Sequence, residues 1–235
     1  KDWTLNIGAN FAYNKNKILD LGMDAAGNPV EYMDNGNMRQ AVGHQYNTFY
    51  MYHWTGKFFN SQEEADAFTE KYGNPFGKKF MAGDLIYADT NGDGKLTSDD
   101  RIYESTSDMP KFTYSFTIGG RWKDFDLSTL WQGVAGVKHV FNREVLGEFS
   151  GDASHASTYW RKAWTENNHN AKMPRVFETA TSPSDMSVAM SDFWLWNTSY
   201  LRLKTLQLGY TIPKNIVRRI GLENVRIYYS AENLF

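Results

Sequence analysis

Cysteine is absent from this chain of 235 residues, and proline occurs only 6 times. The absence of cysteine argues against a disulfide-stapled secreted scaffold, a thiolate metal site and thiol catalysis. The formal net charge is only -2, so no long-range field favours nucleic acid or an anionic membrane surface. We therefore expect no nucleic-acid partner.

A run of about 18 apolar residues is also missing, so the sequence predicts no transmembrane helix. A membrane β-strand needs only about 10 residues of alternating pattern, and such strands leave the mean hydropathy polar. The first stretch, "KDWTLNIGAN", lacks the apolar segment of a signal peptide. Both ends of the chain fall inside strand-like patterns, so we expect a fragment of a larger protein.

Aromatic residues, by contrast, make up 16% of the chain, and apolar residues alternate with polar ones in several places. From 3 to 13, apolar side chains occupy every second position, which predicts a strand. A slip in the apolar phase near Lys204–Thr205 predicts a β-bulge, and Pro213 begins a short helical segment that Gly221 ends. The same alternation predicts further strands near 112–121, 125–132, 200–210 and 225–235. The strands near 112–121 and 125–132 are predicted to form a hairpin.

Two long segments, 14–111 and 133–199, separate these strands and are polar and rich in Gly, Asn, Asp and Trp. Within the first, "NTFYMYHWTGKFF" predicts a strand, and 61–73 predicts a helix with Ser61 as its N-cap and Glu64 three residues later. The remaining connections are short. Short connections on one side and long ones on the other are typical of outer-membrane barrels.

The two faces of the predicted strands indicate which solvent they meet. The polar faces of the first three strands carry mainly Asn, Thr, Ser, Gly and Gln instead of the Lys, Glu and Arg of a sheet in water. The apolar faces end in aromatics that suit the interfacial girdles of a barrel, namely Trp3, Tyr13, Trp122 and Phe125. The pattern favours an all-β fold, a fragment of a large antiparallel transmembrane β-barrel of which about five strands lie here. Long extracellular loops and short helical pieces would connect them, and a soluble β-sandwich remains the alternative.

The stretch "DTNGDGKLTSDD" at 89–100 is close to the D-x-[DN]-x-[DN]-G pattern of a calcium loop, with Gly94 at the sharp turn. We predict a structural Ca²⁺ ion that holds a long loop, and the alternative is a ligand-free Asn/Gly turn. A sensor is disfavoured, because neither flank predicts an amphipathic helix. The predicted ligands are the side chains of Asp89, Asn91, Asp93 and Asp100 and the backbone carbonyl of Lys95.

Other catalytic or binding motifs do not stand out. The five histidines, at 44, 53, 139, 155 and 169, lack metal spacing, and neither a G-x-S-x-G elbow nor a phosphate loop occurs, so we expect no enzyme and no catalytic residue. Trp160 and Trp164, four residues apart, predict one face of a short helix. For the loop aromatics, packing within the loop is favoured over stacking on sugar rings, so no substrate residue is assigned. These aromatics are Tyr159, Trp160, Trp164, Phe193, Trp194 and Trp196.

Three segments together resemble the C-terminal barrel region of SusC/RagA-type TonB-dependent outer-membrane receptors. They are 83–103 ("GDLIYADTNGDGKLTSDDRIY"), 110–136 and 199–235. The resemblance extends over nearly the whole of 1–235 and follows the order of the family. It implies a barrel of about 22 strands, of which this chain supplies about five. The family's plug domain, TonB box and export signal have no counterpart in this sequence.

The resemblance also implies a function, which is TonB-driven import of oligosaccharides or peptides. Import would cross the outer membrane of a Gram-negative bacterium of the Bacteroidetes type. The implied partners are outer-membrane lipid, a SusD-like surface lipoprotein, and TonB, whose contact lies outside this chain. The alternative function is a secreted, calcium-stabilised β-sandwich that binds carbohydrate. The sequence does not identify the substrate.

Overall fold

The computed structural model describes residues 3–141, 157–178 and 180–234, which form two compact units. The first, here called the strand unit, combines Lys1–Lys15, Met109–Val137 and Thr198–Phe235. The second, the loop unit, combines Asn16–Asp108 and Lys138–Asn197. Parts of the predicted ranges, and His155, lie outside the described residues.

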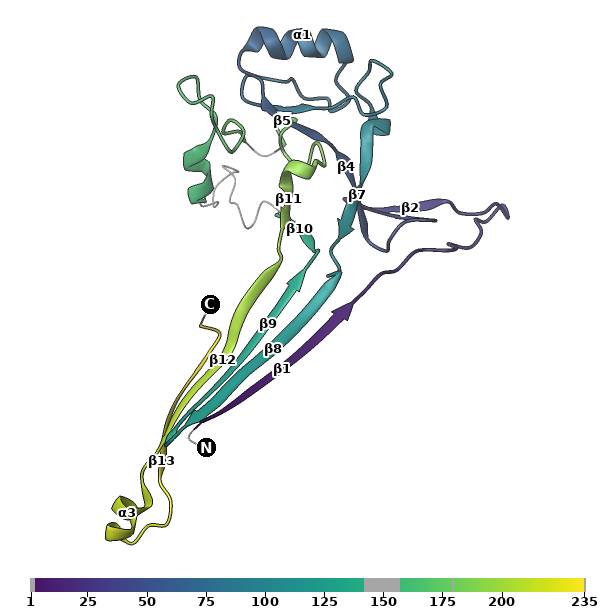
Figure 1. Cartoon of the computed structure of the whole chain (residues 1–235). Coiled ribbons are helices and arrows are strands. Elements are labelled where there is room, and N and C mark those ends of the chain that lie inside the picture. Colours follow the sequence, from purple (N-terminus) through teal and green to yellow (C-terminus); the bar gives the residue numbers. More distant parts are fainter. Residues whose placement is uncertain (1–2, 142–156, 179, 235) are drawn as a thin grey trace. The chain divides into compact units, whose positions relative to one another are not determined.

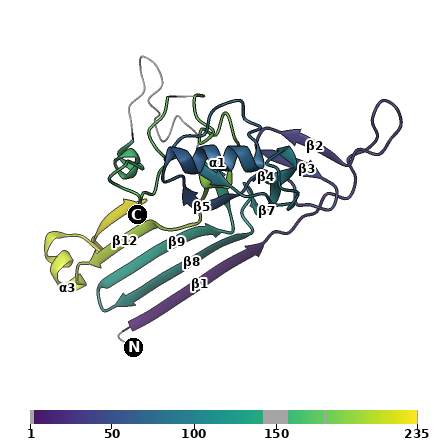
Figure 2. The ribbon, with the colours of Figure 1, turned by 90° about the horizontal axis from the view of Figure 1, so that it is seen from above.

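Five strands form a single antiparallel sheet in the strand unit (Figure 1 and Figure 2). The sheet is open, with β1 and β13 at its two edges. The first two strands in the sheet, β1 and β8, pair from Trp3 with Trp122 to Tyr13 with Phe112, although most of the loop unit separates them in sequence. In the order of the sheet, the strands are β1 (Trp3–Tyr13), β8 (Phe112–Trp122), β9 (Phe125–Ala135), β12 (Tyr200–Thr211) and β13 (Arg226–Glu232).

The predicted all-β fold class is confirmed, and the strands lie where the period of two places them. The predicted bulge is confirmed too, because the register between β12 and β9 shifts between Leu203 and Thr205. Lys204 therefore has no partner position on β9, and its backbone carbonyl accepts a hydrogen bond from Asn233. One extra residue in β12 returns Leu206 to the same face as Leu203.

The two connections at one end of the sheet are short. Lys123 turns the chain between β8 and β9 with a left-handed φ of 53°. Between β12 and β13 lie α3 (Lys214–Val217) and a 3-10 turn, η5 (Arg218–Ile220). Pro213 precedes α3, and Gly221 ends η5 with φ of 77°, a conformation that glycine adopts without strain. The helical segment predicted between proline and glycine is thus confirmed.

The loop unit contains short strands, one longer helix and several 3-10 turns. A four-stranded sheet consists of β2 (Tyr32–Asn35), β3 (Met38–Ala41), β4 (Thr48–Tyr52) and β7 (Arg101–Ser107), in that order. Two further pairs are β5 (Trp54–Phe58) with β6 (Leu85–Tyr87) and β10 (Lys138–Val140) with β11 (Leu195–Asn197). The helical elements are α1 (Gln62–Tyr72), η1 (Ser98–Asp100), η3 (Thr158–Lys162) and η4 (Asp192–Trp194).

The predicted helix after Ser61 is confirmed as α1. The Ser61 hydroxyl accepts a hydrogen bond from the backbone N–H of Glu64, and the Glu64 carboxylate accepts one from the backbone N–H of Asn60. These contacts satisfy backbone donors that the first turn of a helix leaves free. None of the described helices combines the length and apolar character that a membrane crossing requires.

Two details of the loop unit correct the sequence-based expectations. "NTFYMYHWTGKFF" forms two strands, β4 and β5, not one. The break falls at His53 because both neighbouring N–H groups bond elsewhere: that of Tyr52 to the Met190 carbonyl, and that of Trp54 to the Asp192 carboxylate. Most of the predicted long segments 14–111 and 133–199 belongs to the loop unit, which has secondary structure of its own.

The second correction concerns Trp160 and Trp164, which do not share a helix face. The 3-10 turn η3 ends at Lys162, and Ala163 is extended with ψ of 153°, so Trp164 lies beyond the turn. Trp164 packs into a cluster with Phe59, Phe80 and other aromatics, whereas Trp160 packs into a second cluster with Met173. Both indoles are buried, in agreement with the favoured packing role.

Candidate functional site

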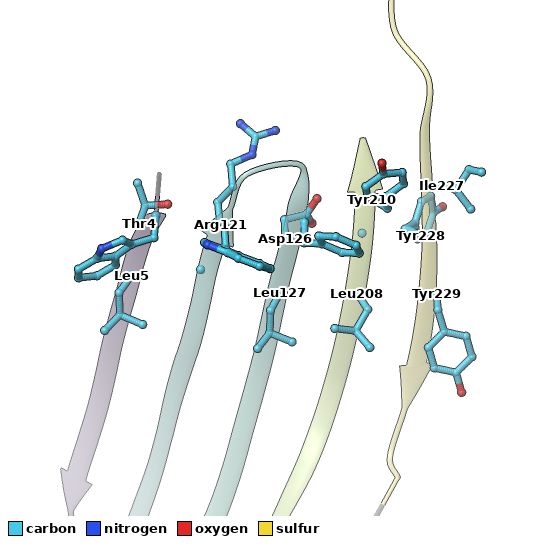
Figure 3. A pocket seen from close by; sticks show the side chains of 15 residues that line it. Thr4, Leu5, Arg121, Asp126, Leu127, Leu208, Tyr210, Ile227, Tyr228 and Tyr229 are labelled. Carbon is cyan, nitrogen blue, oxygen red and sulfur yellow. The ribbon is translucent and has the colours of Figure 1, made fainter. Parts of the chain in front are cut away.

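One face of the five-stranded sheet is apolar from edge to edge. The paired residues on this face follow from the strand registers, because alternate residues of a strand point to the same side. One row across the sheet consists of Leu5, Gly120, Leu127, Leu208 and Tyr229. Figure 3 shows Leu5 of β1, Leu127 of β9 and Leu208 of β12 in this row. No residue paired on this face of the described sheet is charged.

The side chains of this face are exposed to an extent unusual for apolar groups. Ile7, near the middle of β1, is 70% exposed, and Phe11 is 69% exposed. Monomeric soluble proteins rarely expose a contiguous apolar patch of more than a few hundred Å². A surface of this kind is stable only against an apolar solvent or an apolar partner.

Aromatic residues mark the end of this face that lies at the short connections. The last full row consists of Trp3, Trp122, Phe125, Tyr210 and Ile227. Together with the leucine row, it borders an open cavity of about 870 Å³ (Figure 3). Indole and phenol rings are enriched at membrane–water interfaces because they combine an apolar body with a polar tip.

The opposite face of the sheet is polar and hydrogen-bonded. One row runs from Asn10 through Ser115 and Gln132 to Arg202, where Arg202 donates to the Gln132 amide oxygen at 3.3 Å. Nearer the short connections, Arg226 of β13 reaches across β12 to Asp126 of β9, with Nε and Oδ1 3.0 Å apart. The intervening residue is Gly209, where a Cβ would lie 2.4 Å from the Arg226 guanidinium. The charged residues that are paired in this sheet therefore lie on the polar face.

The predicted calcium loop is closed by hydrogen bonds to its own backbone. The two Asp89 oxygens accept from the N–H groups of Gly92 and Gly94 at 2.7 and 2.9 Å. Asp100 is fully buried, and its two oxygens accept from the N–H groups of Thr90 and Thr97 at 2.9 and 2.7 Å. The Asp100–Thr97 contact belongs to a capping box at the start of η1. Asp100 thus connects both ends of the loop.

The predicted ligands of this loop are all oxygen atoms, the ligand type that calcium prefers. In the part of the chain that the structure describes, no group of three or more His, Cys, Asp or Glu side chains is placed to hold a metal ion. Beside Asp89, Asp93 and Asp100, the predicted ligand set also includes the amide oxygen of Asn91 and the backbone carbonyl of Lys95. Calcium at these five residues stays a prediction.

A buried polar cluster that no sequence motif indicated surrounds Asp84. This carboxylate is fully buried; its Oδ1 accepts hydrogen bonds from Arg175 at 2.9 Å, Ser182 at 2.6 Å and Ser184 at 3.0 Å. Its Oδ2 accepts from the Met81 backbone N–H at 2.9 Å. Burial raises the pKa of the Asp84 carboxyl, an effect that the Arg175 charge opposes. The cluster ties the segment before β6 to 175–184, a role that depends on tertiary contacts alone.

A second charged pair lies in the four-stranded sheet. The guanidinium of Arg39 lies over the rings of Tyr32 and Tyr50, at 3.9 and 3.8 Å from their centroids, and Arg39 Nε donates to Asp34 at 2.6 Å. The hydrogen bond from Arg39 holds the pKa of the Asp34 carboxyl below its usual range. Arg39 is 9% exposed, so the stack is a structural element of this sheet.

Most of the loop aromatics gather in one cluster. Trp160 and Trp194 share a buried cluster against which Phe193 and Trp196 pack, whereas Trp164 belongs to another cluster.

The histidines, by contrast, do not converge on one site among the described residues. His53 binds Asp192, with Nδ1 and Oδ2 2.6 Å apart, and His169 binds the Asn60 amide at 3.0 Å. His44 stacks on Tyr103 instead. These three partners lie far from the histidines in the sequence, so no local pattern predicts the contacts.

Comparison with known proteins gives the context for this sheet. No family model matches the chain. The TonB-dependent receptor P3 of Formosa agariphila is 28% identical over 242 residues, which covers 100% of this chain and 22% of the receptor. Receptor P26 of the same species is 32% identical over 234 residues, covering 94% of this chain and 21% of that receptor. The TonB-dependent receptor SusC of Bacteroides thetaiotaomicron is 25% identical over 249 residues, which covers 100% of this chain and 21% of that receptor.

A solved structure, the RagAB peptide transporter, shares the fold with a TM-score of 0.65 and 23% identity, covering 100% of this chain and 24% of that one. Over its whole length, the chain is similar to a segment of SusC/RagA-type TonB-dependent receptors. The resemblance predicted from the three segments is thereby confirmed. The chain spans about a fifth of the length of the curated relatives it matches. All of these relatives are named as receptors or transporters.

Proposed function

We propose that this chain forms part of the wall of an outer-membrane β-barrel that imports nutrients. One observation carries the proposal: the five-stranded sheet exposes a face without charge, while its other face is polar. This is the arrangement of a transmembrane β-barrel, in which lipid covers the outer face and the interior is polar. The relationship to TonB-dependent receptors supports it.

The substrate class of the proposed importer is an oligosaccharide or a peptide. The RagAB structure is described as a peptide transporter, and the SusC relationship extends over the whole chain. The proposal includes TonB as the energy source and a SusD-like surface lipoprotein as the partner. The alternative, a secreted β-sandwich, would need a second layer over the apolar face, and the described strand unit contains only the one sheet.

Deletion of the gene that encodes this chain tests import directly. We expect slower growth on oligosaccharide mixtures or on peptides as sole nutrient, and no defect on monosaccharides and free amino acids. Complementation should restore growth only when TonB is present. Equal growth of the deletion and parent strains on all nutrients would contradict import.

Fractionation tests the location of the protein independently of its substrate. We expect the protein in the outer-membrane fraction, resistant to extraction by alkali, and migrating differently on gels before and after boiling, as closed barrels do. Release into the medium as a detergent-free soluble protein would instead support the secreted module.

A further inference from the structure

The connection between β12 and β13 exposes both aliphatic and basic side chains. Ile216 is 53% exposed, Ile220 is 70% exposed and Leu222 is 46% exposed, while Val217 between them is buried. Ile216 lies in α3 and Ile220 ends η5, so both belong to the same short helical segment. The segment therefore buries one small residue and leaves its larger apolar side chains uncovered.

Basic residues accompany these aliphatic groups. Lys214, Arg218 and Arg219 are exposed, and none of the three forms an ion pair with a carboxylate that the structure describes. Glu223 is the one acidic residue between 214 and 225. The charge of this connection is thus positive, in contrast to the chain as a whole, whose net charge is -2.

This helical segment lies at the end of the sheet that carries the short connections. Thr211 donates its N–H to the Asp124 carbonyl, which places the start of the segment beside the turn between β8 and β9 (Figure 1). That turn carries a further cation, Lys123, whose Nζ lies 5.0 Å from the ring centroid of Trp122. Along the sheet, the order is therefore an uncharged face, then the aromatic row with Trp122 and Tyr210, then the basic segment.

The same order of chemistry occurs across one leaflet of a bilayer, from acyl chains through the interface to the phosphates. We infer that the segment 214–222 docks on the phospholipid head groups of the leaflet at this end of the sheet, with Ile216 and Ile220 in the acyl boundary and Lys214, Arg218 and Arg219 on anionic phosphates. Basic residues beside an anionic lipid surface attract it electrostatically, and aliphatic groups of such a segment enter the acyl boundary. The inference rests on the proposed barrel function.

The test uses the full-length receptor that contains this chain, in nanodiscs of phosphatidylethanolamine with or without phosphatidylglycerol. Native mass spectrometry measures how much phosphatidylglycerol is retained. The variant replaces Lys214, Arg218 and Arg219 with Gln, and we expect retention to fall at least tenfold and to lose its dependence on salt. The matched control replaces three exposed lysines of the loop unit with Gln, namely Lys57, Lys71 and Lys78, and should retain lipid as the parent does.

A photoreactive side chain at Ile220 identifies the occupant of the segment. Adducts with phospholipid support the inference, whereas adducts with a protein overturn it. Equal phosphatidylglycerol retention by the Gln variant and the parent also overturns it. The gel shift on boiling separates the two proposals: an inserted receptor without lipid preference refutes only the head-group contact, while a receptor that never inserts refutes the barrel.

Discussion

Asp84 Oδ1 accepts a hydrogen bond from Arg175 Nε at 2.9 Å, and the carboxylate has no exposed surface. Two hydroxyls and a backbone N–H complete its partners. A buried charge requires such partners because water cannot solvate it. Asp84 therefore joins segments that lie about ninety residues apart in the sequence.

Asp84→Ala should destabilise the loop unit by about 3 kcal/mol, because it leaves Arg175 and two hydroxyls without their acceptor. Denaturant unfolding followed by tryptophan fluorescence measures the change. Asp66→Ala is the matched control, since Asp66 pairs with Lys79 on the surface and its loss should leave the midpoint unchanged. Equal midpoints for the parent and Asp84→Ala would show that the cluster does not stabilise the fold.

The lowered pKa of Asp34 predicts how the stability of the folded protein changes with pH. Because Arg39 lowers this pKa in the folded state, the pair stabilises the fold above the unfolded value of about 3.9, and the contribution is lost as pH falls through the folded pKa. Asp34→Asn should therefore be less stable than the parent at pH 6, with the difference shrinking toward pH 2. Thermal unfolding of both proteins across this range measures it, and a constant difference would contradict the pairing.

Gly83 has φ of 86° and is packed against Trp164, where a Cβ would lie 2.4 Å from a ring carbon. Gly83→Ala should therefore cost about 3 kcal/mol of unfolding free energy, since both backbone strain and overpacking act on it. Gly77→Ala is the control: its φ is 65°, and no atom lies within 4 Å of the new Cβ. It should cost about 1 kcal/mol from backbone strain alone. Equal costs would show that the contact with Trp164 relaxes freely.

Charge on the apolar face should prevent insertion if lipid covers that face. Ile7→Arg places a cation in the middle of β1 and should cost about 2–4 kcal/mol near the bilayer midplane. Asn6→Arg is the matched control, because the neighbouring residue points to the polar face. The amount of heat-modifiable receptor in the outer membrane measures both. Similar amounts of the two variants would argue that this face does not meet lipid.

Calcium at 89–100 should raise the thermal midpoint of the protein at millimolar concentrations, since an ion that binds only the folded loop stabilises it by mass action. Asp93→Ala should abolish this rise, and the heat of binding in calorimetry with it. Asp99→Ala is the control, because Asp99 lies in the same loop but outside the predicted ligands. If chelator and calcium give the same midpoint for the parent protein, the loop is a ligand-free turn.

Local sequence patterns determined much of the strand unit. Alternation placed β1 and the hairpin of β8 and β9, the phase slip placed the bulge at Leu203 to Thr205, and Pro213 and Gly221 bounded α3 with η5. These features follow from the period of a strand and from the φ values that proline and glycine allow, which act within a few residues. The apolar face was therefore visible in the sequence.

Tertiary structure alone decided which distant residues meet. Trp160 and Trp164 enter different clusters, because η3 ends at Lys162 and the chain becomes extended before Trp164. The side-chain partners of Asp84 are Arg175, Ser182 and Ser184, and no local pattern connects them to it. Such contacts form when long segments of the chain fold back on themselves. Burial of the whole core determines this folding, and no single stretch of sequence does.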